Sequence, residues 1–192
     1  MNKIILASSS PRRQQILNQI GVSFEVIPST IHEVMDYSLK PSQVAVSLAS
    51  QKCEDVALRI DKDCIVIAAD TIVVKDGRML GKPKNEQDAY DMLKSLNGQW
   101  HEVITGISLH RVSDGKIIKS FESTKVKMAQ RSDEFLRSYI ATGEPFDKAG
   151  AYGIQGYGSL IVEKVEGCYF NVMGLPVYKL SLLLDELGYK LL

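Results

Sequence analysis

Short segments with the length and residue types of β-strands alternate along this chain with segments in which apolar residues recur every three or four positions. The predicted strands are 3–7, 23–27, 64–69, 72–74, 78–80, 103–112, 116–128 and 160–162. The predicted helices run from Ser10 to Gly21, over 42–60, after the capping residues Asn85 and Ser132, and from about Pro176. This interleaving predicts an α/β fold, and the tight turns near Gly77 and Gly115 imply hairpins and therefore a mixed sheet.

The composition excludes several classes of protein. The 192 residues are 45% apolar and 24% charged, as in a globular protein, and the length suits one large domain or two small halves. Since no Pro/Ser/Gly-rich linker divides the chain, we expect a single domain over 1–192. Because 23 Lys and Arg balance 23 Asp and Glu, the chain lacks the cationic surplus of a nucleic-acid-binding protein. No apolar run approaches the roughly 20 residues of a membrane span, and the first one is too short for a signal peptide. The three cysteines lie too far apart for a disulfide framework, so we expect a reducing, cytoplasmic location.

The segment Ser8-x-Ser10-Pro11-Arg12-Arg13 is the first candidate for chemistry. It places two arginines in the first turn of a helix, where the helix dipole already disfavours cations. One interpretation is an anion site in which helix N–H groups, the serine hydroxyls and two guanidinium groups converge. The other is a pair of solvated arginines on a surface helix that Ser10 caps. The residues alone leave both interpretations open.

Asp70 is the second candidate, because it interrupts an apolar stretch from Cys64 to Val74. An unpaired carboxylate in a sheet core is costly, so we expect Asp70 to face a cleft, a metal or a cation. Thr71 beside it could touch a ligand, although a β-branched residue is ordinary in a strand.

Two lysines and a glutamate carry weaker signals. Lys52 lies on an apolar helix face, where a snorkelling side chain is the simpler interpretation. Lys82 follows a predicted hairpin and is ambiguous by itself. Glu33 lies in a segment without periodicity, where a solvated carboxylate is favoured over a metal ligand.

The segment 147–156 is unusually rich in glycine and reads Asp-Lys-Ala-Gly-Ala-Tyr-Gly-Ile-Gln-Gly. Glycine lets the backbone approach a ligand closely, and the alanine, tyrosine and isoleucine are too apolar for a freely solvated turn. We therefore predict a binding loop, in which the amide of Gln155 could read the edge of a base. His32, His101 and His110 have no metal-ligand spacing. Tyr169 and Asn171 fit the lining of a cleft or a strand-to-helix junction equally well.

Taken together, these segments resemble a known family. The motifs are Ser8-x-Ser10-Pro11-Arg12-Arg13, Ala69-Asp70-Thr71, Lys82-Pro83, the glycine-rich segment 147–156, and Asn171-Val172-Met173-Gly174-Leu175-Pro176. In this order they closely resemble the Maf family of nucleoside triphosphate pyrophosphatases, once described as septum-formation inhibitors. The glycine-rich segment is similar to that of the branch that acts on dTTP and UTP, and differs from that of the sister branch that acts on 7-methyl-GTP.

The resemblance implies a mixed, strongly twisted sheet flanked by helices, with two lobes around a deep central cleft, and usually a homodimer. It implies a divalent metal, Mg²⁺ or Mn²⁺, with Glu33 and Asp70 at the metal and Asp70 as the proton acceptor. It also implies that Arg12 with Arg13, Thr71 and Gln155 affect substrate choice. Lys52 and Lys82 match phosphate-contacting lysines.

The residue types agree with cleavage between the α- and β-phosphates. Arginines and lysines would offset the charge of a triphosphate, and Asp70 would deprotonate a water that attacks the α-phosphorus. Three alternatives are weighed against this hypothesis: a 7-methyl-GTP pyrophosphatase, a non-catalytic nucleotide-binding regulator of septum formation, and a nucleic-acid-binding module. The glycine-rich segment argues against the first and the charge balance against the third. Asp70 argues against the second, because a carboxylate among phosphate contacts hinders binding unless it holds a metal or activates water.

Overall fold

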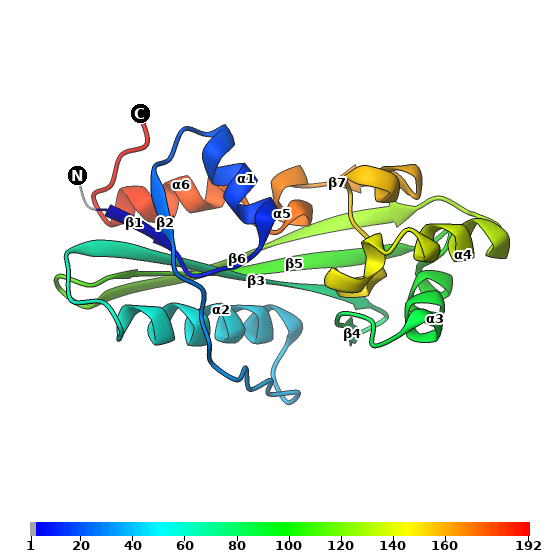
Figure 1. Cartoon of the computed structure of the whole chain (residues 1–192), viewed down its shortest axis with the longest axis horizontal. Helices are drawn as coiled ribbons and strands as arrows, with labels where there is room; N and C mark the ends of the chain where they lie inside the picture. The colour runs from blue at the N-terminus through cyan, green and yellow to red at the C-terminus, as the bar shows by residue number, and fades with distance from the viewer. Residues whose placement is uncertain (1–2) are drawn as a thin grey trace. The chain divides into compact units, whose positions relative to one another are not determined.

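A computed structural model of the chain describes residues 3–192 (Figure 1). The strands are β1 Lys3–Leu6, β2 Phe24–Val26, β3 Cys64–Lys75, β4 Arg78–Leu80, β5 Trp100–Arg111, β6 Lys116–Met128 and β7 Val162–Glu166. The α-helices are α1 Pro11–Gln19, α2 Pro41–Ala57, α3 Glu86–Leu96, α4 Asp133–Ala141, α5 Tyr169–Met173 and α6 Val177–Glu186. Three short 3₁₀ helices, η1 Glu144–Asp147, η2 Ala149–Ala151 and η3 Gly156–Leu160, lie between α4 and β7.

The strands form one mixed sheet, which confirms the predicted α/β class. Its order is β2-β1-β3-β5-β6-β7, and β4 pairs with β3 outside this path. Strand β1 is parallel to both β2 and β3, whereas β4 is antiparallel to β3 and β7 is antiparallel to β6. Helical crossovers connect the parallel strands, and a tight turn joins β3 to β4 as the sequence predicts. The long segment that contains α4 and the 3₁₀ helices connects β6 to β7.

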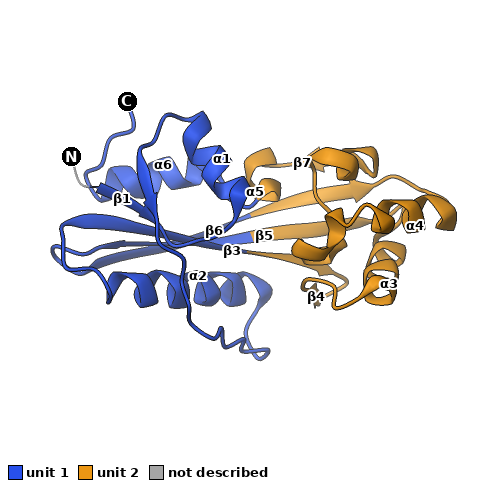
Figure 2. Cartoon of the chain, viewed as in Figure 1, with its two compact units in different colours: residues 1–70, 105–122, 174–192 blue, residues 71–104, 123–173 orange. Residues whose placement is uncertain are grey.

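The chain divides into two compact units (Figure 2). Unit 1 comprises the residues up to 70 together with 105–122 and 174–192, and unit 2 comprises 71–104 and 123–173. The division falls between Asp70 and Thr71, within the single strand β3. The two neighbours in sequence therefore belong to different units.

In unit 1, helix α2 covers one face of the parallel strands, and α1 and α6 cover the other (Figure 1). Buried Cys53 and Val56 of α2 pack in one cluster with alternate residues of β1 and β3, such as Ile5 and Val66. The intervening strand residues, Ile4 among them, are also fully buried and point to the opposite face. Strands buried on both faces explain why the runs 3–7 and 64–69 are apolar without alternation.

In unit 2, helices α3 and α4 pack with the 3₁₀ helices around a separate apolar cluster that includes Leu93, Leu136 and Ile161. Both helix starts are capped as predicted. The side chain of Asn85 accepts a hydrogen bond from Asp88 N at 2.9 Å, and that of Ser132 accepts one from Phe135 N at 3.2 Å.

Several predicted boundaries are corrected. Strand β3 runs unbroken through Asp70 to Lys75, so 64–69 and 72–74 belong to one strand. The strand predicted at 160–162 exists but is displaced, because Leu160 ends η3 and β7 runs from Val162 to Glu166.

For Asn171 the sequence fits the lining of a cleft or a strand-to-helix junction. In the structure Asn171 lies in helix α5. Asn171 is fully buried, and its Nδ2 donates to Val103 O at 2.9 Å and to Thr124 Oγ1 at 3.0 Å. It is therefore an internal link of unit 2 and does not line an open surface.

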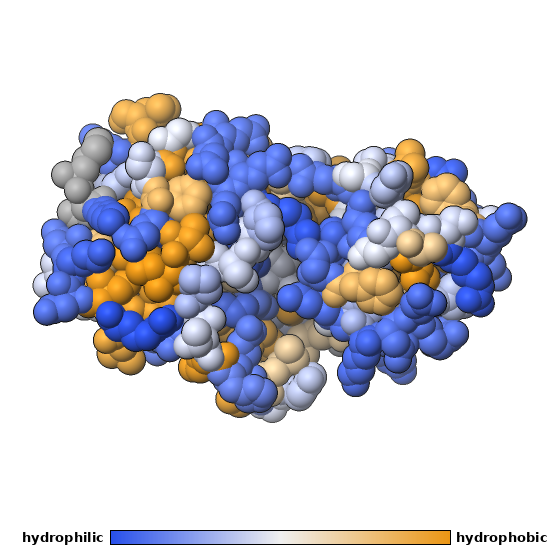
Figure 3. Space-filling view, viewed as in Figure 1, coloured by the Kyte–Doolittle hydropathy of each residue, from blue (hydrophilic) through white to orange (hydrophobic). Residues whose placement is uncertain are grey.

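The surface mixes hydrophilic and hydrophobic residues. The face shown in Figure 3 is largely hydrophilic, with a hydrophobic area in the part that unit 1 occupies in Figure 2. Exposed apolar side chains of unit 1 include Val26, Leu58 and Tyr178. Across the described residues 3–192, none of the helices is long and apolar enough to cross a membrane.

The close approach of α2 to β5 at Gly106 yields a stability prediction. A Cβ at Gly106 would lie 2.2 Å from the carbonyl carbon of Ala45, so Gly106→Ala must push helix α2 off the sheet. We expect a loss of about 1–3 kcal/mol or more in the free energy of unfolding, measured by urea denaturation. Gly81→Ala is the matched control, because a Cβ at Gly81 meets no heavy atom within 4 Å. Equal unfolding midpoints for the two variants would contradict the packing described here.

Candidate functional site

Lys52, Asp70 and Glu33 form a cluster of charges in unit 1. Lys52 Nζ donates to Asp70 Oδ1 at 2.5 Å and lies 3.2 Å from Glu33 Oε1. The Lys52 and Asp70 side chains are only 15% and 14% exposed, whereas Glu33 is 42% exposed. Asp70 therefore faces a cation, as predicted. The snorkelling interpretation of Lys52 is wrong, because its ammonium group is enclosed by two carboxylates.

Arg13 is held by one hydrogen bond to the nearby Ser8 and one to the distant Gly174. Its Nη1 donates to Ser8 Oγ at 3.0 Å, and its Nε donates to Gly174 O at 2.8 Å. Removal of the guanidinium group from water lowers the pKa of Arg13, an effect that the charges of Asp70 and Glu33 oppose and that of Arg12 reinforces. Arg13 thus interacts electrostatically with Arg12, Asp70 and Glu33. The solvated interpretation therefore does not hold for Arg13.

At the start of α1, the side chain of the N-cap residue does not cap the helix. Ser10 is the N-cap residue, as predicted, but its side chain accepts no hydrogen bond from the helix, which corrects its predicted capping role. Instead, Ser10 N donates to Ser8 Oγ at 3.3 Å. Arg12 is half-buried in the first turn, which contains no acidic residue. The serine hydroxyl of Ser10 and the positive end of the helix are therefore available to an anion.

The metal expected from the family resemblance is compatible with the carboxylates of this cluster. In the part of the chain that the structure describes, no three His, Cys, Asp or Glu side chains are placed to hold a metal ion. Glu33 and Asp70, however, both contact the ammonium group of Lys52, so the two carboxylates lie close to each other. Two carboxylates suffice for Mg²⁺, which usually completes its coordination with water and substrate phosphates.

The other three predicted residues lie in unit 2. Thr71 is half-buried in β3, Lys82 is exposed just after β4, and Gln155 is half-buried between η2 and η3. Gly150 N donates to Gly81 O at 3.0 Å, which joins the turn that carries Lys82 to the glycine-rich segment. The structure thus gathers the seven residues Ser8, Ser10, Arg12, Arg13, Glu33, Lys52 and Asp70 in unit 1 and these three in unit 2.

The glycine-rich segment is only partly regular: η2 covers Ala149–Ala151, η3 begins at Gly156, and residues 152–155 between them are outside any helix. Two polar contacts, one within this segment and one just after it, are not predicted from the sequence. Glu144 accepts hydrogen bonds from the backbone of Tyr157 and Gly158, each at 2.9 Å. His101 Nε2 and Tyr152 Oη are 2.6 Å apart in the interior of unit 2. The only sequence signal for Glu144 was its place between Gly143 and Pro145, beside the segment it holds.

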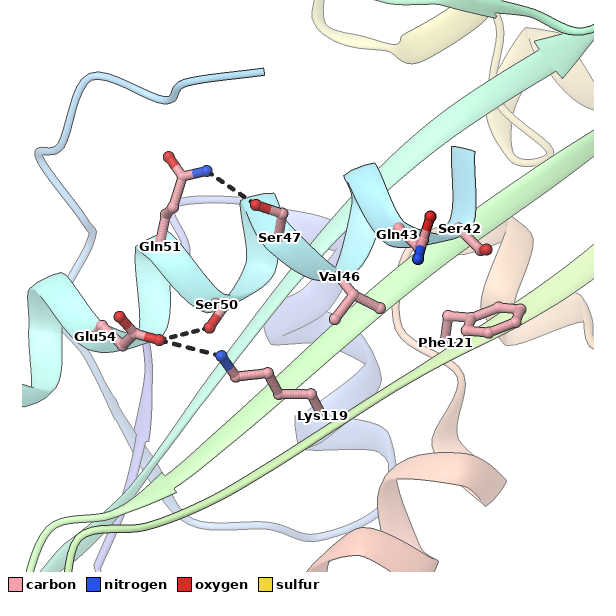
Figure 4. Close-up of a pocket in the computed structure, with 9 residues that line it drawn as sticks. All are labelled: Ser42, Gln43, Val46, Ser47, Ser50, Gln51, Glu54, Lys119 and Phe121. Atoms are coloured by element: carbon pink, nitrogen blue, oxygen red, sulfur yellow. Dashed lines mark hydrogen bonds and ion pairs between the residues drawn. The ribbon is translucent and has the colours of Figure 1, made fainter. Parts of the chain in front are cut away.

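A groove of about 460 Å³ in unit 1 contains none of the predicted residues (Figure 4). Its walls are formed by α2 and β6, with the lining residues Ser42, Gln43, Val46, Ser47, Ser50, Gln51, Glu54, Lys119 and Phe121. Inside it, Glu54 accepts hydrogen bonds from Ser50 Oγ at 2.6 Å and from Lys119 Nζ at 3.3 Å. Gln51 Nε2 donates to Ser47 Oγ at 3.3 Å. Of these contacts, the one between Glu54 and Lys119 joins α2 to β6, and the other two lie within α2.

The fold belongs to a class known from solved structures. A HAM1 protein from Coxiella burnetii matches with a TM-score of 0.55 over 97% of this chain and 100% of its own, at 15% sequence identity. Within that class the family is more specific. The family model described as Maf-like protein matches residues 3–187, so the chain belongs to the Maf family, as its motifs predicted.

Curated relatives resemble the chain over its full length. A protein from Caldicellulosiruptor saccharolyticus named dTTP/UTP pyrophosphatase is 51% identical, and the match covers 100% of this chain and 98% of the relative. A protein of the same name from Carboxydothermus hydrogenoformans is 52% identical over 97% of this chain and 100% of its own.

The His101–Tyr152 pair predicts a pH dependence of stability. Burial lowers the pKa of His101 to about 4, and the charge of Lys75 acts in the same direction. Between pH 6.5 and about 4 the unfolded chain takes up a proton that the folded chain does not, so stability falls as the pH falls. The loss from this residue approaches about 3 kcal/mol near pH 4.

Urea denaturation at a series of pH values checks this expectation. His101→Phe should flatten the dependence between pH 4 and 6.5, whereas His32→Gln, at an exposed histidine, should leave it unchanged. An unchanged slope in His101→Phe would show that another group carries the effect.

Proposed function

We propose that this protein is a nucleoside triphosphate pyrophosphatase that hydrolyses dTTP and UTP to the monophosphate and pyrophosphate. The observation that carries the proposal is the cluster in which Lys52 bridges Asp70 and Glu33 beside Arg13. Relatives about 50% identical over the full chain bear the name dTTP/UTP pyrophosphatase, which supports the choice of nucleotides.

The cations have distinct tasks in the proposed reaction. Arg12, Lys52 and Lys82 contact the phosphates, and Ser8 and Ser10 add hydroxyl donors at the positive end of α1. Arg13 is already bonded through two of its nitrogens to Ser8 and Gly174, so its task is to fix the start of α1 and to add positive charge.

Asp70 orients a water molecule and takes its proton during attack on the α-phosphorus. The new bond joins the water oxygen to that phosphorus, and the bond from the α-phosphorus to the bridging oxygen breaks, so pyrophosphate leaves. The hydrogen bond from Lys52 fixes the orientation of the Asp70 carboxylate.

We also propose a divalent cation, Mg²⁺ or Mn²⁺, held by Glu33 and Asp70. Such an ion, when bound, neutralises phosphate charge and stabilises the charge that develops on the leaving group. Thr71 and Gln155 affect substrate choice, and the amide of Gln155 pairs with the edge of the pyrimidine.

A homodimer in the cytoplasm completes the proposal. The resemblance to the family supports the dimer, and exposed apolar residues of unit 1 such as Leu58 and Tyr178 offer area that a second copy could bury. The free thiols of Cys53, Cys64 and Cys168 support a reducing compartment.

The test of the activity is a panel of nucleoside triphosphates assayed with Mg²⁺ or Mn²⁺ for both pyrophosphate and orthophosphate. We expect pyrophosphate, released fastest from dTTP and UTP, and no turnover in a chelator. Orthophosphate as the product would indicate γ-phosphate cleavage and a different mechanism. Faster release from 7-methyl-GTP would assign the chain to the sister activity, and binding without turnover would support a regulator.

Asp70→Asn tests the proton acceptor. The amide keeps an oxygen for Lys52 but cannot take a proton, so turnover of dTTP should fall by about 10²–10⁴-fold. Nucleotide affinity, measured by calorimetry, should change little. Asp63→Asn is the matched control, because Asp63 is exposed just before the same strand. An Asp70→Asn enzyme with nearly the original rate would exclude Asp70 as the proton acceptor.

A further inference from the structure

The carboxylate of Glu144 is the main polar anchor of the segment that carries Gln155. Its Oε1 accepts hydrogen bonds from Tyr139 Oη at 3.0 Å and from Gly158 N at 2.9 Å. Its Oε2 accepts one from Tyr157 N at 2.9 Å. One side chain at the start of η1 therefore binds two successive N–H groups at the start of η3 and a hydroxyl of α4.

The same assembly also holds the other side of Gln155. Gly153 N donates to Tyr139 Oη at 3.4 Å, and Tyr139 is the residue whose hydroxyl donates to Glu144. Gln155 lies between Gly153 and Tyr157, so both flanks of its backbone are tied to the Tyr139–Glu144 pair. All of these residues belong to unit 2.

The glycines around Gln155 leave room for these hydrogen bonds, but by themselves they do not restrict the backbone to one conformation. Gly156 has a φ of +64°, and a Cβ there would lie 2.5 Å from Glu144 Oε2. A Cβ at Gly158 would lie 2.0 Å from Gly153 O. Glycine allows the segment to close over the carboxylate, but it also allows many other conformations when the carboxylate is absent. A glycine-rich backbone keeps one geometry only when external bonds select it.

We propose that Glu144 is a positioning residue for base selection, which acts by holding the backbone on both sides of Gln155. The inference rests on the proposed function, in which the Gln155 amide reads the pyrimidine edge. Such reading depends on the placement of the amide within a fraction of an ångström, because hydrogen bonds weaken steeply with poor geometry. Glu144 itself touches no base in this proposal.

The carboxylate is chemically required for this role. It presents acceptors to all three donors, and hydrogen bonds to an ionised group are stronger than those between neutral groups. In Glu144→Gln one oxygen becomes an NH₂ group, which can only donate and would face a backbone N–H. Glu144→Gln therefore loosens the segment with almost no change in side-chain volume.

The test is a double-mutant cycle between Glu144→Gln and Gln155→Ala. The quantity measured for each variant is kcat/KM for dTTP divided by kcat/KM for dCTP. These two substrates differ chiefly at the edge that an amide would read. We expect Glu144→Gln to lower the ratio by about tenfold, the equivalent of one or two hydrogen bonds. Gln155→Ala should lower it at least as much, and the double variant no further than Gln155→Ala alone.

Hydrogen exchange gives a second readout that does not depend on turnover. The amides of Tyr157 and Gly158 should exchange faster in Glu144→Gln than in the original protein. Glu134→Gln is the matched control, since it makes the same charge change at an exposed position of α4 and should alter neither readout. Tyr139→Phe removes one donor and keeps the test open if Glu144→Gln does not fold; it should shift both readouts in the same direction.

The possible failures are distinguishable. If the original protein releases no pyrophosphate from any nucleotide, the proposed function fails and the inference with it. If it releases pyrophosphate but does not discriminate dTTP from dCTP, or if Gln155→Ala keeps the ratio, the activity stands and the inference is overturned. An unchanged ratio or unchanged amide exchange in Glu144→Gln, or losses that simply add in the double variant, also overturns it.

Discussion

The ion pair between Lys52 and Asp70 is the interaction on which the proposed site depends. A carboxylate in the middle of an apolar strand is costly unless a cation meets it, and Lys52 does so from helix α2. The pair can form only because α2 lies close to the sheet, and the bare backbone of Gly106 permits that approach to Ala45. The same ammonium group draws in Glu33 from the segment before α2. A packing contact between a helix and a strand thus determines where the charges of the site meet.

Other residues of the proposed site are also positioned by hydrogen bonds to groups elsewhere in the same unit. Arg13 donates hydrogen bonds to Ser8 and Gly174. The bond to Gly174 links the start of α1 to the segment that leads into α6. In unit 2, Glu144 secures the backbone around Gln155. The proposed chemistry therefore relies on the motif residues and on other residues, such as Glu144, that keep motif residues in position.

Much of the fold could be predicted because its signals are local. Asn85 and Ser132 cap their helices as expected, since a cap bonds to an N–H only three residues away. Prediction failed where distant contacts decide. Whether Lys52 snorkels or pairs depends on Asp70, 18 positions along the chain and in a different element. The ends of η3 and β7 depend on the partner strand β6, so the strand predicted at 160–162 is displaced. Two of the three donors to Glu144 are backbone N–H groups of Tyr157 and Gly158, and backbone groups leave no mark in the sequence.

The sequence by itself determined the α/β class, most of the helices and hairpins, and the motifs that mark the chain as a member of the Maf family. Periodicity, caps and turn residues act over a few positions, so they can be interpreted without knowledge of the fold. Only the tertiary structure decided that Lys52 is a partner of Asp70, that Arg13 is fixed at Gly174, and that Glu144 organises the glycine-rich segment. Each of these depends on which distant groups the packing of the core brings within hydrogen-bonding distance, and that is a property of the folded chain as a whole.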